Sequence, residues 1–185
     1  LNLAVDFLPG ALDLDVGAFP LDPLAAGRIL WFDALIGNVD RSWRNPNMLF
    51  WHGKPYLIDH GAALSFHHRW SALPSGRRSY DLREHALLRC SPDIRAADSE
   101  LAAVLTPALV RASVELAPES WLAGEPGFAG VNEVRAAYTS ELLARFAARE
   151  SWLGAVQDAV ATSTTASGNR NARPPRRPEW LAGPA

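Results

Sequence analysis

The feature of this sequence that most constrains its fold is a pair of short apolar runs, NMLFW and PYLID, on either side of the tripeptide HGK. Runs of apolar and aromatic residues that bracket a glycine are typical of a β-hairpin. With the turn centred on Gly53, Asn47 lies opposite Asp59 at the open end of the hairpin. Because directly opposed side chains point to the same face, we expect two oxygen-bearing side chains to converge there.

Helical signals surround this hairpin. A capping side chain followed by proline begins three predicted helices, at Asp22-Pro23, Ser91-Pro92 and Thr106-Pro107. The first should end near Gly37, and an apolar stripe predicts a longer helix from about Asn132 to about Val160. Residues 1–20 show no clean period and are interpreted as an irregular or short-helical entry segment. The predicted fold class is therefore mainly α (α+β), with one hairpin and a helical remainder over residues 79–160.

The C-terminal end has a different composition. Residues 162–185 combine Ser, Gly, Pro and Arg without periodicity, which predicts a disordered tail after one domain over residues 1–161. The sequence begins with Leu1 rather than Met. We therefore expect it to be the C-terminal part of a longer polypeptide.

Composition excludes several classes of protein. A formal charge of −2 and a pI near 6.2 argue against a nucleic-acid partner. No apolar stretch approaches the ~18 residues of a membrane span, so no membrane association is expected. The single cysteine, Cys90, excludes an internal disulfide and a cysteine-based zinc cage. A reducing cytoplasm is the simplest predicted location.

Polar residues of catalytic character gather in residues 33–61, DALIGNVDRSWRNPNMLFWHGKPYLIDHG. Phosphoryl transfer from a nucleotide needs a carboxylate that orients the attacking hydroxyl and oxygen ligands that hold magnesium against the phosphates. Asp40 in a loop, Asn47 at the start of one strand and Asp59 at the end of the next supply such a set. This order favours a phosphotransferase.

The segment NVDRSWRNPNMLFW, followed by LIDHGAAL, resembles the HipA-like kinase family, distant relatives of the protein and phosphoinositide kinases. Residues 23–70 match best, and LNLAVDFLPGA and SFHHRW extend the resemblance over residues 1 to about 150. The resemblance implies a protein-kinase-like C-lobe with one catalytic hairpin. It also implies ATP and Mg²⁺ as cofactors and transfer of the γ-phosphoryl group to a hydroxyl acceptor, a protein Ser/Thr or a small-molecule alcohol.

By position, the resemblance assigns roles to individual residues. Asp40 would be the catalytic aspartate, and Arg41 beside it would brace the loop or reach a phosphate or carboxylate. Asn47 and Asp59 would bind the metal. Asn45 stands at the protein-kinase spacing after Asp40 and is the alternative ligand to Asn47, which the hairpin favours.

Asn38, Asn45 and His60 are expected on the cofactor side of the site, where Asn38 would brace the loop and His60 would orient Asp59. The sequence also departs from the family. A kinase N-lobe carries a glycine-rich phosphate cover and a lysine that pairs with the phosphates. The sole lysine here is Lys54 in the hairpin turn, so we expect the N-lobe to be missing from this chain.

Three other interpretations stay open. A non-catalytic pseudokinase or interaction module is consistent with the absence of the phosphate-binding lysine. A metal-dependent hydrolase would use Asp40 and Asp59 with imidazoles from His52, His60, His67 and His68. A purely structural interpretation makes Asp40 and Arg41 a surface ion pair, with Asn47 capping a turn.

Overall fold

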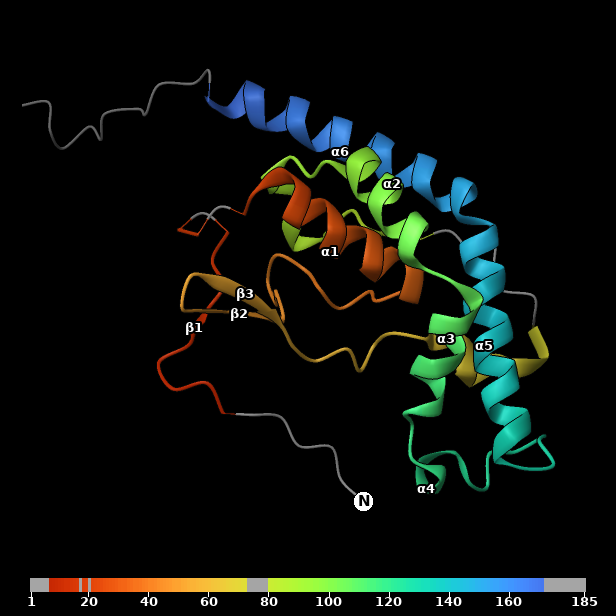
Figure 1. The fold of residues 1–185 in the computed structure, drawn as a ribbon. Helices are drawn as coiled ribbons and strands as arrows, with labels where there is room; N and C mark the ends of the chain where they lie inside the picture. The colour runs from red at the N-terminus through yellow and green to blue at the C-terminus, as the bar shows by residue number, and fades with distance from the viewer. Residues whose placement is uncertain (1–6, 17, 20, 73–79, 172–185) are drawn as a thin grey trace, which may run out of the picture.

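The structure, a computed structural model, describes residues 7–16, 18–19, 21–72 and 80–171 (Figure 1). Helices make up most of this part of the chain, and a small antiparallel sheet of three strands lies on one side of it. Its strands are β1 (Leu12–Asp13), β2 (Met48–Trp51) and β3 (Lys54–Leu57), in that order. The predicted α+β class, mainly helical with one hairpin, is confirmed.

The hairpin is present, with a register one residue away from the predicted one. The cross-strand pairs are Met48–Leu57, Leu49–Tyr56, Phe50–Pro55 and Trp51–Lys54. The loop is therefore only His52-Gly53, whose φ angles are 47° and 77°. Positive φ at both positions is what a two-residue hairpin turn of type I′ requires, because its twist matches that of the strands.

This register changes how the two ends of the hairpin meet. The predicted opposition of Asn47 and Asp59 is wrong, because the backbone N–H of Ile58 donates to the Asn47 carbonyl at 3.0 Å. Asn47 and Asp59 both have left-handed backbone, with φ of 48° and 47°. The chain therefore bends sharply on entering β2 and again on leaving β3, and Asn47 and Asp59 remain at the same end of the hairpin.

Residues 1–20, predicted to be irregular or short-helical, contribute a strand instead. Within β1, Leu12 pairs with Phe50 and Asp13 with Leu49, so the hairpin gains a third, short strand at its edge. The ring of Phe19 stacks on that of Phe50, with centroids 4.5 Å apart. Two alternating positions were too few to reveal this strand by their pattern.

Helix α1 (Pro23–Ile36) confirms the first predicted helix at both ends. The Asp22 carboxylate caps it by accepting from the backbone N–H of Ala25 at 3.0 Å, and Gly37 closes it with φ of 67°. Only a residue without a Cβ adopts that left-handed conformation at little cost. The position of this helix matters because the candidate catalytic loop follows it directly.

The next two predicted helices are α2 (Ile94–Val104) and α3 (Pro107–Glu115). Thr106 caps α3 as predicted, with its hydroxyl accepting from Leu109 N at 3.1 Å. The start of α2 differs, because Asp93 rather than Ser91 is the capping residue. Ser91 instead ends the short 3₁₀ helix η2 (Ala86–Cys90). A further short helix, α4 (Glu119–Leu122), follows α3.

The long helix predicted over residues 132–160 is two helices, α5 (Val131–Ala147) and α6 (Arg149–Asn171). The indole N–H of Trp152 donates to the Arg145 carbonyl at 3.2 Å, which satisfies a backbone acceptor at the break. The predicted end near Val160 is also wrong, because residues 162–171 of the predicted tail are helical. The rest of that tail, residues 172–185, lies outside the described residues.

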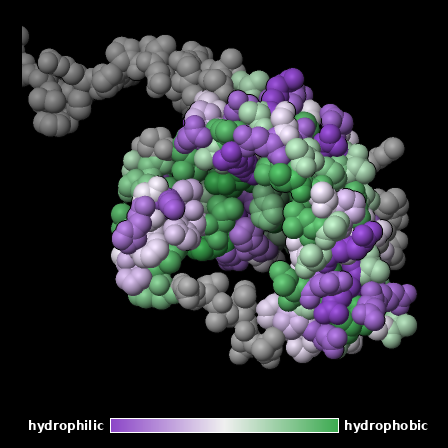
Figure 2. All heavy atoms as spheres, viewed as in Figure 1, coloured by the Kyte–Doolittle hydropathy of each residue, from purple (hydrophilic) through white to green (hydrophobic). Residues whose placement is uncertain are grey.

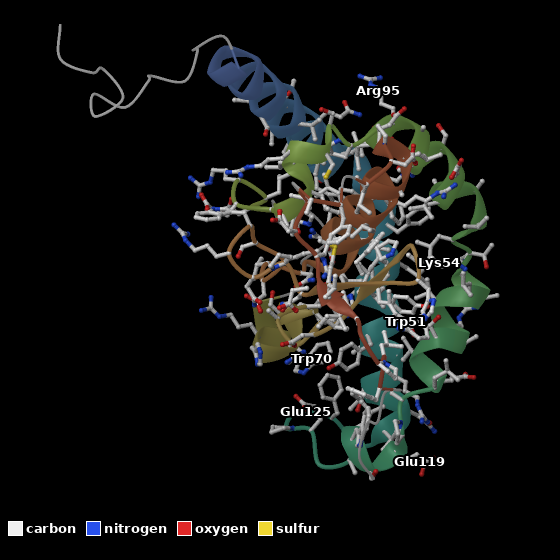
Figure 3. All side chains as sticks on the ribbon, turned by 90° about the vertical axis from the view of Figure 1, so that its left-hand side faces the viewer. Trp51, Lys54, Trp70, Arg95, Glu119 and Glu125 are labelled. Atoms are coloured by element: carbon white, nitrogen blue, oxygen red, sulfur yellow. The ribbon has the colours of Figure 1, made fainter. Side chains whose placement is uncertain are left out.

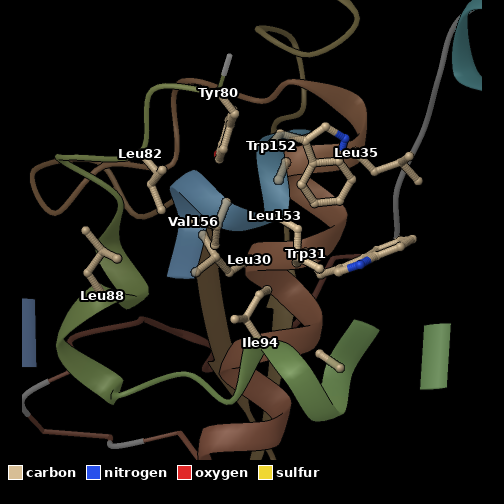
Figure 4. Close-up of a cluster of buried hydrophobic side chains, with 12 residues drawn as sticks. Leu30, Trp31, Leu35, Tyr80, Leu82, Leu88, Ile94, Trp152, Leu153 and Val156 are labelled. Carbon is tan, nitrogen blue, oxygen red and sulfur yellow. The ribbon is translucent and has the colours of Figure 1, made fainter. Parts of the chain in front are cut away.

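Helix α1 lies at the centre of the packing. Figure 4 shows Leu30 and Trp31 of α1 against Trp152, Leu153 and Val156 of α6, in a cluster of buried apolar side chains. A second cluster lies towards the sheet and consists of Leu14, Ala26, Met48, Ala86 and Leu87. Because α1 contributes to both clusters, it joins the sheet to the helices.

Helix α1 also makes a very close contact with the start of α2. A Cβ added at Gly27 would lie 2.4 Å from the carbonyl oxygen of Asp93, far inside normal contact distance. The backbone N–H of Asp93 donates to the Pro23 carbonyl at 2.8 Å. The absence of a side chain at position 27 therefore lets the two backbones touch.

The segment after the hairpin runs along α5. It contains the 3₁₀ helix η1 (Ser65–Ala72), in which Trp70 donates its indole N–H to Glu125 at 2.8 Å (Figure 3). The Trp70 ring also packs edge-on against Tyr138 of α5, with centroids 5.0 Å apart. None of the described helices has the length and apolar character that a membrane crossing requires.

Candidate functional site

Asp33, near the end of α1, is the centre of a buried polar cluster. Its carboxylate is fully buried and accepts hydrogen bonds from Arg41 Nε at 2.5 Å, from Asn38 Nδ2 at 2.9 Å and from His85 Nε2 at 3.1 Å. We call these four residues the Asp33 network. It joins α1, the loop after it and the start of η2, and so fixes the loop from inside the protein.

The contacts of His85 define its protonation. The backbone N–H of Leu87 donates to Nδ1 at 3.2 Å, so Nδ1 carries no proton and Nε2–H points at Asp33. Burial lowers the pKa of His85 below its ordinary value, more than the Asp33 charge raises it. Neutral His85 is therefore a hydrogen-bond donor and adds no charge to the Asp33 network.

The Asp33 carboxylate stays ionised. Burial alone would raise its pKa, but hydrogen bonds from His85, Arg41 and Asn38, with the Arg41 charge, hold the pKa below its ordinary value. A buried carboxylate is stable only when its charge is paired and its lone pairs are occupied. The donors around Asp33 meet both conditions.

Arg41 is wholly committed to the protein interior. Its five N–H bonds are directed at Asp33, twice, at the carbonyls of Pro46 and Asn47, and at Nε2 of His60. The predicted bracing role is therefore observed, with Asp33 as the carboxylate. No donor is left for a phosphate, so Arg41 acts by positioning the loop. The surface ion pair with Asp40 that one interpretation required is not what the geometry shows.

Asp40 lies between two members of the Asp33 network, yet its side chain is partly exposed. Its backbone N–H donates to Asn38 Oδ1 at 3.3 Å. Its Oδ2 atom accepts from Asn47 Nδ2 at 3.1 Å and from Asn45 Nδ2 at 3.3 Å. Both asparagines proposed as metal ligands thus converge on the same carboxylate oxygen. Of the two, Asn47 is nearly buried and Asn45 is exposed.

Asp59 follows β3 at the same end of the hairpin. Its carboxylate is exposed, and Oδ1 accepts from the backbone N–H of Gly61 at 3.2 Å. Its neighbour Ile58 is joined to Asn47 through the backbone. The structure therefore places Asp59 one residue from the Asn47 contact, as a carboxylate directed towards solvent.

His60 has a different partner from the predicted one. Its Nε2 accepts from Arg41 Nη2 at 3.0 Å, so within the described part of the chain it supports the loop arginine rather than orienting Asp59. Burial, with the nearby Arg41 charge, lowers the pKa of His60. Its ring packs edge-on against Phe32, with centroids 6.1 Å apart. His60 is therefore neutral, and its Nε2 atom is engaged by Arg41.

The oxygen-rich face of Asn45 and Asn47 borders a cavity of about 330 Å³. Asp13 and Asp15, at and just after β1, line the same cavity. Neither aspartate was among the predicted site residues, because the strand that carries Asp13 was not recognised. The neighbourhood of the loop is thus rich in hard oxygen donors.

A histidine-based metal centre finds no support. Among the described residues, no group of three or more His, Cys, Asp or Glu side chains could hold a metal ion. His52 lies in the hairpin turn against Trp51, and His67 packs on His68. A magnesium site differs, because Mg²⁺ usually takes one or two carboxylates, with waters and phosphate oxygens. The amide oxygen of Asn47 and the Asp59 carboxylate fit that donor chemistry.

Two residues of the Asp33 network were missed from sequence. Asp33 sits within an apolar helix, and a carboxylate among core-facing neighbours is itself a signal of a buried, paired group. His85 is 52 residues further along the chain, and no local pattern connects it to Asp33.

No protein-family model matches this chain, and neither a curated protein nor a solved structure matches it.

Proposed function

We propose that this domain is the C-terminal lobe of an ATP- and Mg²⁺-dependent phosphotransferase of the HipA-like kinase type, which transfers the γ-phosphoryl group of ATP to a hydroxyl acceptor. The observation that supports it most is the convergence of Asn47 and Asn45 on one oxygen of Asp40, with the exposed Asp59 following Ile58, whose backbone N–H donates to the Asn47 carbonyl. A candidate base and candidate metal ligands thus belong to the same end of the hairpin.

Asp40 is suited to receive a proton. Within the described residues, both side-chain hydrogen bonds to its carboxylate end on Oδ2, which leaves Oδ1 for an incoming hydroxyl. In the proposed step the acceptor oxygen bonds to the γ-phosphorus, the bond to the bridging oxygen of ADP breaks, and the hydroxyl proton passes to Asp40. The Asp33 network would hold Asp40 in position without touching the reacting atoms.

Asn47 and Asp59 would hold the metal. Because Asn47 Nδ2 donates to Asp40, the amide oxygen on the other side of that group is directed away from the carboxylate. The N–H of Gly61 fixes one oxygen of Asp59. Bound Mg²⁺ would neutralise charge on the phosphates.

The experiment that tests this proposal is a calorimetric titration of the chain with ATP, with and without Mg²⁺. We expect ATP binding that requires Mg²⁺ and weakens at least tenfold in the Asp59→Ala variant. Asp158→Ala, which removes an exposed carboxylate from α6, is the matched control and should bind like the unaltered chain. Unchanged binding by Asp59→Ala would contradict the proposal. No binding by the unaltered chain would mean that the nucleotide needs the missing N-lobe or that the domain is a pseudokinase.

A second variant separates catalysis from binding. Asp40→Asn should still bind ATP with Mg²⁺, but it should lose phosphoryl transfer to protein or small-molecule hydroxyls, followed with γ-labelled ATP. If the unaltered chain binds the nucleotide and transfers nothing, either the pseudokinase interpretation is correct or transfer requires the N-lobe that is expected to be missing from this chain.

A further inference from the structure

The cavity of about 330 Å³ beside Asn45 and Asn47 is bordered on another side by the chain at the end of β1. That part of its lining consists of Asp13, Leu14 and Asp15. Figure 2, in the view of Figure 1, shows hydrophilic side chains gathered on the sheet side of the molecule. A polar cavity of this size is suited to water and to a small hydrated ion.

The pairing of β1 with β2 determines which aspartate lies beside Asn47. Asp13 ends β1, and the backbone N–H of Leu14 still donates to the Met48 carbonyl at 2.9 Å, so the register continues beyond the strand. The next opposed pair in that register is Asp15 and Asn47, and both line the cavity. Opposed residues of antiparallel strands have their side chains on the same face. Asp15 is therefore the carboxylate next to the Asn47 amide, and Asp13 lies roughly 7 Å further along the strand.

The Asn47 amide has one atom without a partner. Asn47 is only 9% exposed, and its Nδ2 atom donates to Asp40 at 3.1 Å. No described residue donates a hydrogen bond to its Oδ1 atom. The polar atoms of buried side chains are nearly always paired, so this open oxygen points to a missing partner. An oxygen acceptor is satisfied by a hydrogen-bond donor or by a cation.

The charge of the cavity favours a cation. Asp13 and Asp15 place two carboxylates on its wall. Arg44 is the one cationic side chain among the described residues that line it, and its guanidinium pairs with Glu84 at 3.6 Å. The cavity therefore carries an excess of negative charge, which a bound cation would offset. Carboxylate and amide oxygens suit Mg²⁺ and Mn²⁺.

We propose that the Asp15 carboxylate is a further ligand of the divalent cation that Asn47 holds, so that the ion joins the end of β1 to the candidate catalytic loop. Water would fill its other coordination positions when no nucleotide is bound. The inference rests on the proposed function for the role of Asn47 as a metal ligand, and it adds that the ion binds without nucleotide. Asp13 would act on the ion through its charge and not as a ligand.

A titration of the full chain with Mn²⁺, without nucleotide, tests the site. The electron paramagnetic resonance signal of free Mn²⁺ measures binding. We expect Asp15→Asn to weaken binding at least tenfold. Asp13→Asn removes the same charge from the neighbouring position and should weaken binding about threefold or less, because a solvent-screened charge at that distance has a small effect. Asp158→Asn, an exposed carboxylate of α6, should leave binding unchanged.

Equal losses in Asp15→Asn and Asp13→Asn would reduce the effect to charge alone and overturn the proposal. Absence of Mn²⁺ binding in the unaltered chain would overturn it as well. Asp15→Ala, which removes both carboxylate oxygens, serves if Asp15→Asn fails to fold, as judged by circular dichroism. Mn²⁺ binding that is weakened in Asp59→Ala and unchanged in the Asp15 variants would remove this ligand and leave the phosphotransferase proposal standing, since Mg²⁺-dependent ATP binding tests that proposal separately.

Discussion

The carboxylates of Asp33 and Asp40 belong to neighbouring parts of the chain and lie in opposite surroundings. Asp33 is fully buried, and donors from Arg41, Asn38 and His85 surround it. Asp40 is partly exposed, and its side chain receives two amide hydrogen bonds, both on one oxygen. A carboxylate whose lone pairs are all occupied can only hold structure, whereas one with an open oxygen can accept a proton. The comparison separates a carboxylate that holds the loop in position from one that is free to take the proposed catalytic role.

The largest expected effect comes from removing the buried charge. Asp33→Asn leaves the Arg41 guanidinium buried without a counter-ion, so the free energy of unfolding in urea should fall by about 3–5 kcal/mol. The matched change in the exposed region, Asp40→Asn, should lower it by less than about 1 kcal/mol. Similar losses in the two variants would remove the distinction between the two carboxylates.

A second variant keeps the positive charge at position 41 and removes the planar guanidinium group. Arg41→Lys retains a cation beside Asp33, but an ammonium group cannot also reach the carbonyls of Pro46 and Asn47 and the His60 ring. We expect a loss of about 2 kcal/mol in unfolding free energy, again by urea titration. A variant as stable as the unaltered chain would show that charge alone is what Asp33 requires.

The dependence of stability on pH tests the neutral state of His85. Its pKa is lowered in the folded protein from an ordinary value of 6.5, so below that pH the unfolded chain binds more protons than the folded one. Stability should therefore fall as the pH drops from about 6.5, by up to about 1.4 kcal/mol per pH unit for this group. Thermal unfolding between pH 5 and 7.5 measures it. His85→Gln should flatten the slope, and an unchanged slope would assign it to other groups.

The smallest effect on stability is expected at Asp59, the exposed carboxylate of the candidate site. Asp59→Ala removes an exposed carboxylate that accepts one backbone hydrogen bond, so it should lower the unfolding free energy by about 1 kcal/mol or less. Urea titration of Asp59→Ala and Asp33→Asn under the same conditions compares their losses of unfolding free energy. A loss as large as that of Asp33→Asn would make Asp59 a structural residue, and any effect on nucleotide binding would then need another explanation.

The structural features that depend on residues close together in the sequence were predicted well. Both ends of α1 follow from Asp22-Pro23 and Gly37, because caps act within one turn of helix. The hairpin was recognised, but its register depends on left-handed backbone at His52, which no residue preference near the turn required. The break between α5 and α6 depends on the Trp152 indole reaching a backbone carbonyl, a packing event that an apolar stripe does not encode.

The candidate site divides in the same way. Asp40, Asn45 and Asn47 lie within one loop, and their nearness could be predicted from their order. The partner of Arg41 could not, since it required knowing that Asp33 faces inward and that His85 folds back onto it. The loop residues Asp40, Asn45 and Asn47 are therefore close in sequence. The Asp33 network that supports them joins residues far apart in the sequence.

Gly27 restricts the sequences that can adopt this fold. A Cβ at that position would lie 2.4 Å from the Asp93 carbonyl oxygen, and every other amino acid carries that carbon. A library with all twenty amino acids at position 27, screened for resistance to proteolysis, should return glycine alone. The same helix carries Asp33, which holds the candidate catalytic loop, so the position of that loop depends on a residue that cannot be changed.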